Sequence, residues 1–243
     1  GERSMDMNRR HFFRVSGAGL VGSSLVAMGF SPTAALAQTP PSAAEISRYN
    51  GIHLAAADGS PGAVQSMATA GADLELRDSN GRTPFLIAAY RGHAHVMETL
   101  AAAGANVNAL DAQSYDAVTI AAVANDLRTL EAALKLGNKA GNITSPYTGT
   151  ALIAAAHLGH AEVVEMLIKA GAPLDHVNNL GWTALIEAVV LGDGGARHQA
   201  TVAALIKAGA DITIADRDGM TPLQLAQSRN YKEIADLIKS GAP

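Results

Sequence analysis

The sequence repeats itself at a period near 33 residues from Asn50 to its C-terminal end. The unit is clearest over residues 78–108, which read DSNGRTPFLIAAYRGHAHVMETLAAAGANVN. A period of this length indicates a solenoid, in which each unit packs mainly on its two neighbours. Six successive units end at a glycine, namely Gly71, Gly104, Gly137, Gly171, Gly209 and Gly241.

Each unit predicts a turn, a short helix, a loop and a second helix. Thr83 can cap the first helix through its hydroxyl, and Pro84 fits the first helical position, where no backbone N–H is needed. Gly92 and His93 separate the two helices, and the second helix has apolar residues at helical spacing. Aromatic residues make up only 4% of the chain, so the core is built from Ala, Leu, Ile and Val. This composition suits closely packed helices.

The stretch GRTPFLIAAYRGHAHVMETLAAAGANVNA over residues 81–109 resembles the ankyrin repeat almost throughout. The resemblance implies an all-α solenoid, an L-shaped stack of helix pairs joined by hairpin-like loops. Hairpin tips and first helices would together form a concave face. We expect an ankyrin domain over 46–243, with six units near 46–77, 78–110, 111–144, 145–177, 178–215 and 216–243.

Two departures from the family pattern stand out. The family's T-P-L-H tetrapeptide appears without its His in the four units that keep the Thr; His53 in the first unit alone retains it. Apolar packing is expected to replace the usual His hydrogen bonds there. The third unit is the most degenerate, with Asp116 in place of Thr and Asn125-Asp126 in place of Gly-His. Because repeat stability is approximately a sum over neighbours, this unit is predicted to be a soft spot.

The first 37 residues have the composition of an export signal. A basic start is followed by an uncharged Ala/Gly/Ser segment and by Ala35-Leu36-Ala37 at a cleavage site. Arg9, Arg10 and Phe12 resemble the bacterial twin-arginine signal. We therefore expect residues 1–37 to be a tag remnant plus this signal, 38–45 to be a linker, and the protein to be exported to the periplasm of a Gram-negative bacterium. The alternative is an uncleaved anchor.

The charge balance disfavours nucleic acid and anionic membranes as partners. The chain carries 18 basic and 22 acidic residues, and removing residues 1–37 leaves 14 and 20, a net charge of −6. Binding to polyanions needs clustered basic residues, which the mature chain lacks. We expect a monomer that binds a protein and does not insert stably in a membrane once its signal is removed.

The predicted contact surface lies at the hairpin tips and at the ends of the first helices. Aromatic and Arg side chains are the usual anchors of an interface because they bury much area at little entropic cost. An alternative is that these rings pack on neighbouring tips. The candidate residues are Arg82, Tyr90, Arg91, Tyr115, Tyr147, His157, Leu158, Leu180, Trp182 and Leu191.

The fifth unit carries five extra residues between its two helices. This insertion loop runs from Asp193 to Arg197 and includes Gly194 and Gly195. Its backbone N–H groups could bind an anion or a carboxylate of a partner. The competing interpretation is a solvated extension, which repeat proteins tolerate. A receptor for a small ligand or anion, enclosed by Tyr147, Trp182 and this loop, is the alternative function.

Catalysis, metal binding and a cofactor are not predicted. The sequence has no nucleophile elbow, no zincin motif, no Walker loop and no Cys. His157 and His160 lie three residues apart, but no carboxylate completes a metal site. We therefore predict a non-enzymatic adaptor. Because the twin-arginine route carries folded proteins, a redox or stress-related enzyme is the narrower hypothesis for its partner.

Overall fold

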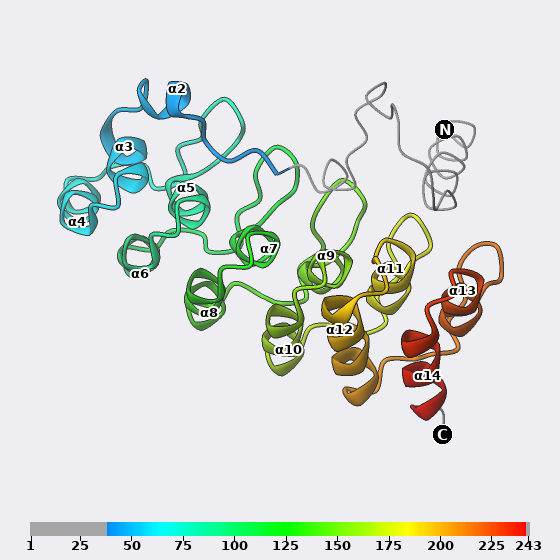
Figure 1. Cartoon of the computed structure of the whole chain (residues 1–243). Coiled ribbons are helices and arrows are strands. Elements are labelled where there is room, and N and C mark those ends of the chain that lie inside the picture. The colour runs from blue at the N-terminus through cyan, green and yellow to red at the C-terminus, as the bar shows by residue number, and fades with distance from the viewer. Residues whose placement is uncertain (1–37, 242–243) are drawn as a thin grey trace.

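The computed structural model describes residues 38–241, and these form a curved stack of helix pairs (Figure 1). First helices lie in one row, second helices in the other, and the loops before the first helices project to one side. The predicted all-α solenoid of helix pairs with projecting loops is therefore confirmed. In chain order the helices are α2 (Ala43–Ile46), α3 (Gly51–Ala57), α4 (Pro61–Thr69), α5 (Pro84–Tyr90), α6 (Ala94–Ala102), α7 (Ala117–Val123), α8 (Leu127–Lys135), α9 (Ala151–Leu158), α10 (Ala161–Lys169), α11 (Ala184–Val190), α12 (Ala196–Lys207), α13 (Pro222–Ser228) and α14 (Lys232–Ser240).

The first helices begin at the predicted caps. Thr83 Oγ1 accepts a hydrogen bond from Leu86 N at 3.3 Å, and Thr150, Thr183 and Thr221 cap their helices in the same way. Such a cap satisfies one of the backbone donors that a helix start leaves unpaired. Five of the glycines that follow the second helices have positive φ and nothing near a built Cβ, namely Gly71, Gly104, Gly137, Gly171 and Gly209, with +98° at Gly104. Backbone conformation, and not space, selects glycine there.

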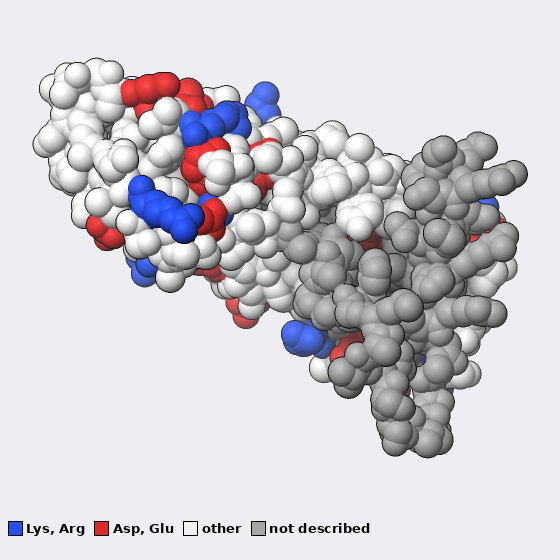
Figure 2. All heavy atoms as spheres, turned by 90° about the horizontal axis from the view of Figure 1, so that it is seen from above, with Lys and Arg blue, Asp and Glu red and all other residues white. Residues whose placement is uncertain are grey.

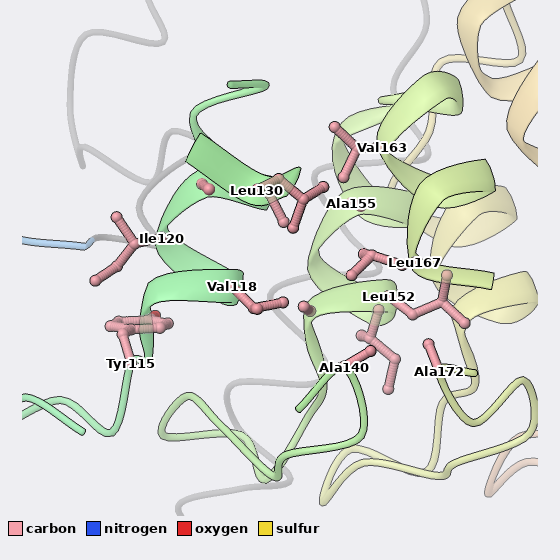
Figure 3. Close-up of a cluster of buried hydrophobic side chains, with 14 of the residues drawn as sticks. Tyr115, Val118, Ile120, Leu130, Ala140, Leu152, Ala155, Val163, Leu167 and Ala172 are labelled. Atoms are coloured by element: carbon pink, nitrogen blue, oxygen red, sulfur yellow. The ribbon is translucent and has the colours of Figure 1, made fainter. Parts of the chain in front are cut away.

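The core is continuous from the first unit to the last and consists of aliphatic side chains. Figure 3 shows part of it, where Val118 and Leu130 of the third unit lie next to Leu152, Val163 and Leu167 of the fourth. All five are fully buried. No unit could bury these faces alone, so the helix pairs are stable only as a stack.

Three histidines at or near the start of a second helix join their unit to the unit before it. His93 Nε2 donates to Ala57 O at 3.1 Å, and His160 Nδ1 donates to Ala122 O at 3.0 Å. His198 Nε2 donates to the carbonyl of His157 at 2.9 Å. The acceptors are the carbonyls near the ends of the preceding first helices, which lack partners within their own helix. These side chains therefore act in the stack itself.

Residues 38–49, called the strap below, pack onto the repeats and do not form a free linker. The strap contains the four-residue helix α2, and Thr39 Oγ1 contacts Gln113 Oε1 at 3.0 Å. The linker expected over 38–45 is thus docked on the loops of the second and third units. The export residues Arg9, Arg10 and Phe12 lie outside the described residues.

The third unit replaces the Thr cap with a buried polar network. Asp116 Oδ1 caps α7 by accepting from Thr119 N at 2.9 Å, while its Oδ2 accepts from the amides of Asn138 and Asn142 at 3.0 and 2.9 Å. Asn108 Oδ1 binds the same two amides. Asp116 and Asn138 are 1% and 2% exposed. Asp116, the departure at the cap position, thus belongs to a buried hydrogen-bonded set, whereas Asp126 caps α8 separately through Thr129 N. Both contacts argue against an unsupported soft spot.

Candidate partner-binding surface

Five hairpin-like loops, called tips 2 to 6, form the upper edge of the stack in Figure 1. They span residues 78–82, 111–115, 144–149, 178–182 and 216–220, and a backbone hydrogen bond closes each at its base, as from Asp78 N to Arg82 O. Neighbouring tips are also joined, for example by Asn179 N, which donates to Tyr147 O at 2.9 Å. The tips thus form one continuous surface.

Four of the predicted contact residues are buried and do not lie on this surface. Arg82, Tyr115, Trp182 and His157 are 0%, 1%, 1% and 4% exposed. Their assignment as exposed anchors was wrong, because the strap covers Arg82, and the rings and the imidazole pack within the stack. For Tyr115 and Trp182 this is the competing interpretation, that the rings pack on their neighbours. Burial also raises the pKa of the Tyr115 phenol to about 12.

His157 belongs to a buried polar pair between α9 and α11. Its Nδ1 lies 3.3 Å from Glu187 Oε2, and the other carboxylate oxygen accepts from Asn178 Nδ2 at 2.7 Å. Both His157 and Glu187 are 4% exposed. Within the part of the chain that the structure describes, no group of three His, Asp or Glu side chains has the arrangement of a metal site.

The remaining predicted residues reach the surface to different degrees. Arg91 is exposed, whereas Tyr90, Tyr147, Leu158, Leu180 and Leu191 are partly buried. Tyr90 also acts between units, since its hydroxyl donates to Asp111 Oδ2 at 2.8 Å. Burial, followed by the Asp111 charge, raises the pKa of this phenol. Tyr147 and Leu180 are the predicted residues that lie on tips and stay accessible.

The structure shows exposed apolar side chains that were not among the predicted contact residues. The exposed large hydrophobic side chains of the described residues are Leu54, Leu76, Ile143 and Val177, at 36–48% exposure. Leu54 lies on α3, and the other three lie just before a tip; none is on a second helix. Ile143 and Val177 each directly precede a tip, where the second and sixth units have Arg77 and Ala215. Comparing the residues before each turn would have found them.

Charge is unevenly distributed along the row of tips. Tip 2 contains Asp78 and Arg82 and lies beside Glu45 of the strap, whereas residues 143–149 and 177–182 contain no charged side chain. In Figure 2, seen from the side of the tips, acidic and basic residues lie together over the N-terminal end and uncharged surface adjoins them. We call the uncharged region the neutral tip patch; it consists of Ile143, Pro146, Tyr147, Val177 and Leu180.

The insertion loop is fixed by its own contacts. Asp193 Oδ1 accepts from Gly195 N and from His198 Nδ1, both at 2.9 Å, and Tyr231 of the sixth unit donates to Gly192 O at 3.0 Å. The hydrogen bond from the Gly195 amide is the main cause that holds the pKa of Asp193 below its usual value, and the bond from His198 is the next. A Cβ on Gly194 would lie 2.5 Å from the Tyr231 ring.

The loop therefore differs from both interpretations of the sequence, a flexible anion site and a solvated extension. The Asp193 carboxylate already accepts the hydrogen bond of the Gly195 amide, which an anion would otherwise have accepted. Ala196 and Arg197 form the first turn of α12, which has 12 residues where α6, α8, α10 and α14 have 9. The loop also follows α11, so it lies at the opposite end of that helix from tip 5.

Comparison with known proteins agrees with this architecture. A model of ankyrin repeats (3 copies) matches residues 52–139 and 120–216. The chain belongs to the ankyrin-repeat family. It is similar to the putative ankyrin repeat protein YahD of Escherichia coli (strain K12), with 33% identity over 176 residues, covering 72% of this chain and 71% of that protein.

Solved structures give the same result. An ankyrin repeat domain from Acinetobacter baumannii AYE matches with a TM-score of 0.74 and 40% identity, covering 78% of this chain and 96% of that one. The ankyrin repeat protein EF0377 matches with a TM-score of 0.73 and 30% identity, over 79% and 98% of the two chains. The ankyrin repeat domain of Bcl-3 shares the fold at 23% identity, with a TM-score of 0.70 and coverage of 77% and 81%.

Ankyrin repeats generally mediate contacts between proteins, and the described surface is consistent with that role. No helix among residues 38–241 has the length and apolar character needed to cross a membrane.

Proposed function

We propose that this ankyrin protein is an exported, non-enzymatic adaptor that binds a partner protein through the neutral tip patch. The observation that carries the proposal is the distribution of exposed apolar side chains in the described chain. The large ones occur just before the tips and on one first helix, and the described second helices have none. Water would be released from Ile143 and Val177 on binding, which favours association.

The patch has the features of an interface core. It combines apolar side chains with one tyrosine on neighbouring, hydrogen-bonded tips, so little ordering is needed on binding. Charged residues are usually depleted at the centre of an interface and placed at its rim. Here the charged tip 2 and the charged tip 6, with Arg217 and Asp218, lie on either side of the neutral tips.

The experiment compares proteins captured from a periplasmic extract by three immobilised chains. The first is the wild type, and the second carries Ile143→Asp with Val177→Asp. The third is a matched control with two acidic substitutions at exposed positions of second helices, Gln65→Asp on α4 and Ala200→Asp on α12. We expect the tip variant to capture at least tenfold less partner than the wild type. Its melting temperature should equal that of the control. Equal capture by all three chains would refute this surface.

The export route and the class of partner are part of the same proposal. Arg9 and Arg10 support twin-arginine export to the periplasm, and the route's use by folded, often cofactor-bearing proteins supports a redox or stress-related enzyme as the partner. An absorption spectrum of the captured protein would show haem or another chromophore. A colourless, metal-free partner would exclude a cofactor-bearing enzyme and leave the adaptor function in place.

The receptor function is less well supported. The Gly195 amide already donates to Asp193, and Trp182 is buried. Two of the groups that were predicted to contact a ligand are therefore not accessible to it. A thermal-shift screen with anions and metabolites separates the two functions, since a ligand that binds only the folded state raises the melting temperature.

A further inference from the structure

The strap makes a small set of polar contacts with tips 2 and 3. Arg82 is their centre: its Nη1 donates to Thr39 O at 2.7 Å and its Nη2 donates to Glu45 Oε1 and, at 3.1 Å, to Tyr49 Oη. Asn80 Nδ2 donates to the same Glu45 oxygen at 2.6 Å. One carboxylate oxygen of the strap therefore enters a notch formed by a guanidinium and an amide.

Apolar packing contributes little to this docking. Helix α2 buries none of its residues; Pro41 is the one buried residue of the strap, and Ile46 and Tyr49 pack on the core with partial burial. Segments with few buried apolar contacts are the ones that open locally at low free-energy cost. The strap thus meets the condition for a segment that detaches while the repeats stay folded.

Contacts within tip 2 also hold the notch in place, independently of the strap. Arg82 Nε donates to Asp78 Oδ2 at 2.7 Å, and the Asp78 carboxylate also accepts from the Arg82 amide, so tip 2 itself fixes the guanidinium. The Nη atoms and the Asn80 amide then lack their strap acceptors. The strap covers Arg82, so its removal exposes guanidinium and amide donors that another carboxylate can engage in charge-assisted hydrogen bonds.

We propose that Arg82 and Asn80 form a recognition site for a carboxylate-bearing segment of a protein partner, and that the strap is the displaceable occupant of this site. The partner segment carries an Asp or Glu that takes the place of Glu45 and a backbone carbonyl that takes the place of Thr39 O. The inference rests on the proposed protein-binding function for the origin of that segment. Its test needs no natural partner and uses a surface separate from the neutral tip patch.

Tethering explains why the site is closed in the free protein. A segment joined to its site by a short linker has an effective concentration on the order of millimolar. A free segment with the same contacts therefore competes poorly until the tethered carboxylate is removed or the free segment makes additional contacts. The neutral tip patch, which begins after tip 3, offers such contacts.

The experiment measures binding of a fluorescent peptide with the sequence of residues 38–49 to full-length chains by anisotropy. The chains are the wild type, the opened variant Glu45→Ala, the same variant with Arg82→Gln, and a control with Glu45→Ala and Arg128→Gln on the exposed surface of α8. A second peptide carries Glu45→Gln. We expect the opened variant and its Arg128 control to bind the first peptide at least tenfold more tightly than the wild type. Arg82→Gln, or the Gln peptide, should lose that gain.

Two further measurements decide the interpretation. Hydrogen exchange should show at least a tenfold loss of protection at the Ile46 amide in the opened variant, since that amide bonds to Ser42 O in the docked strap. Because the chain has no Cys, Thr39→Cys and Gln113→Cys can be joined by a short bismaleimide in an otherwise unmodified chain. This cross-linked strap should exclude the peptide.

Three results would overturn the proposal. They are equal peptide binding by wild type and opened variant, unchanged Ile46 protection in the opened variant, or a released strap whose site still fails to bind the peptide. Each leaves the neutral tip patch untouched, because Ile143→Asp and Val177→Asp test that function separately.

Discussion

The buried network of the third unit gives the sharpest test of how this chain compensates for a degenerate repeat. Asp116 Oδ1 accepts from Thr119 N, and Oδ2 accepts from two amide NH₂ groups, those of Asn138 and Asn142. The substitution Asp116→Asn keeps the size and can keep the cap. The new side-chain NH₂ group at position 116 would then face the NH₂ groups of Asn138 and Asn142, and no NH₂ group can accept a hydrogen bond.

The expected cost follows from these contacts. Two amide donors lose a charged acceptor in a site that is 1–2% exposed, and an unsatisfied buried polar group costs about 1–3 kcal/mol. Allowing for partial rearrangement around Asn142, which is partly exposed, we expect Asp116→Asn to lower the free energy of unfolding by about 2 kcal/mol. Asp116→Ala also loses the cap, worth about 1 kcal/mol, so its loss should be about 3 kcal/mol.

The same unit supplies the matched control. Asp126 caps α8 by accepting from Thr129 N at 3.1 Å, and its other oxygen accepts from the Thr129 hydroxyl at 2.6 Å. A hydroxyl can turn and accept from an amide, so Asp126→Asn should cost less than about 0.5 kcal/mol. Urea unfolding followed by circular dichroism measures all three variants. Equal stability of Asp116→Asn and Asp126→Asn would refute the argument from donor and acceptor matching.

Three further predictions follow from other regions. Deleting residues 193–197 should leave a cooperative fold but lower the free energy of unfolding, measured in urea, by about 2 kcal/mol. The reason is that the hydrogen bonds of Asp193 and the first turn of α12 are lost. Unchanged stability would show that the loop is a solvated extension. The Ser42 amide first, and Arg82 after it, hold the pKa of Glu45 below its usual 4.5. Strap docking should therefore be complete above pH 4.5 and weaken as the pH falls through the lower pKa that Glu45 has in the folded protein. Hydrogen exchange at the Ile46 amide measures the docking. The pH profile should be flatter in Glu45→Gln. Changing Arg9 and Arg10 together to Lys should keep the protein out of the periplasm on cell fractionation, and mature protein found there would contradict the twin-arginine assignment.

The repeat pattern predicted most of the architecture because its signals are local. Thr83, Pro84 and Gly104 act through their own backbone conformation or through residues three or four positions away, so a single sequence reveals them. The docked strap could not be predicted in the same way. Glu45 and Arg82 lie 37 residues apart, and a run of Pro, Ser and Ala between a signal and a repeat has the composition of a linker.

The contact surface was only partly predictable for a different reason. A repeat position defines where a side chain starts, whereas the neighbouring unit decides whether it is covered. Arg82, Tyr115, Trp182 and Met220 occupy equivalent positions before the first helix. The first three are buried, Arg82 through the strap and the two rings through packing, and Met220 stays partly exposed. Large rings at these positions therefore indicate tight stacking as readily as they indicate binding.

The fourth unit shows where an accessible surface arises in such a stack. At the position of those side chains it has Gly149, and its tip is one residue longer than the others, with φ of +68° at Ser145 and +50° at Thr148. A glycine there brings no side chain to cover the neighbouring tip, and the longer turn carries Pro146 and Tyr147 outward. The exposed Ile143 directly precedes this tip, and the exposed Val177 directly precedes the next one. The irregular tip and the neutral tip patch are therefore one feature, and restoring a five-residue tip with a large residue at position 149 should reduce partner capture as strongly as Ile143→Asp does, while raising the stability of the stack.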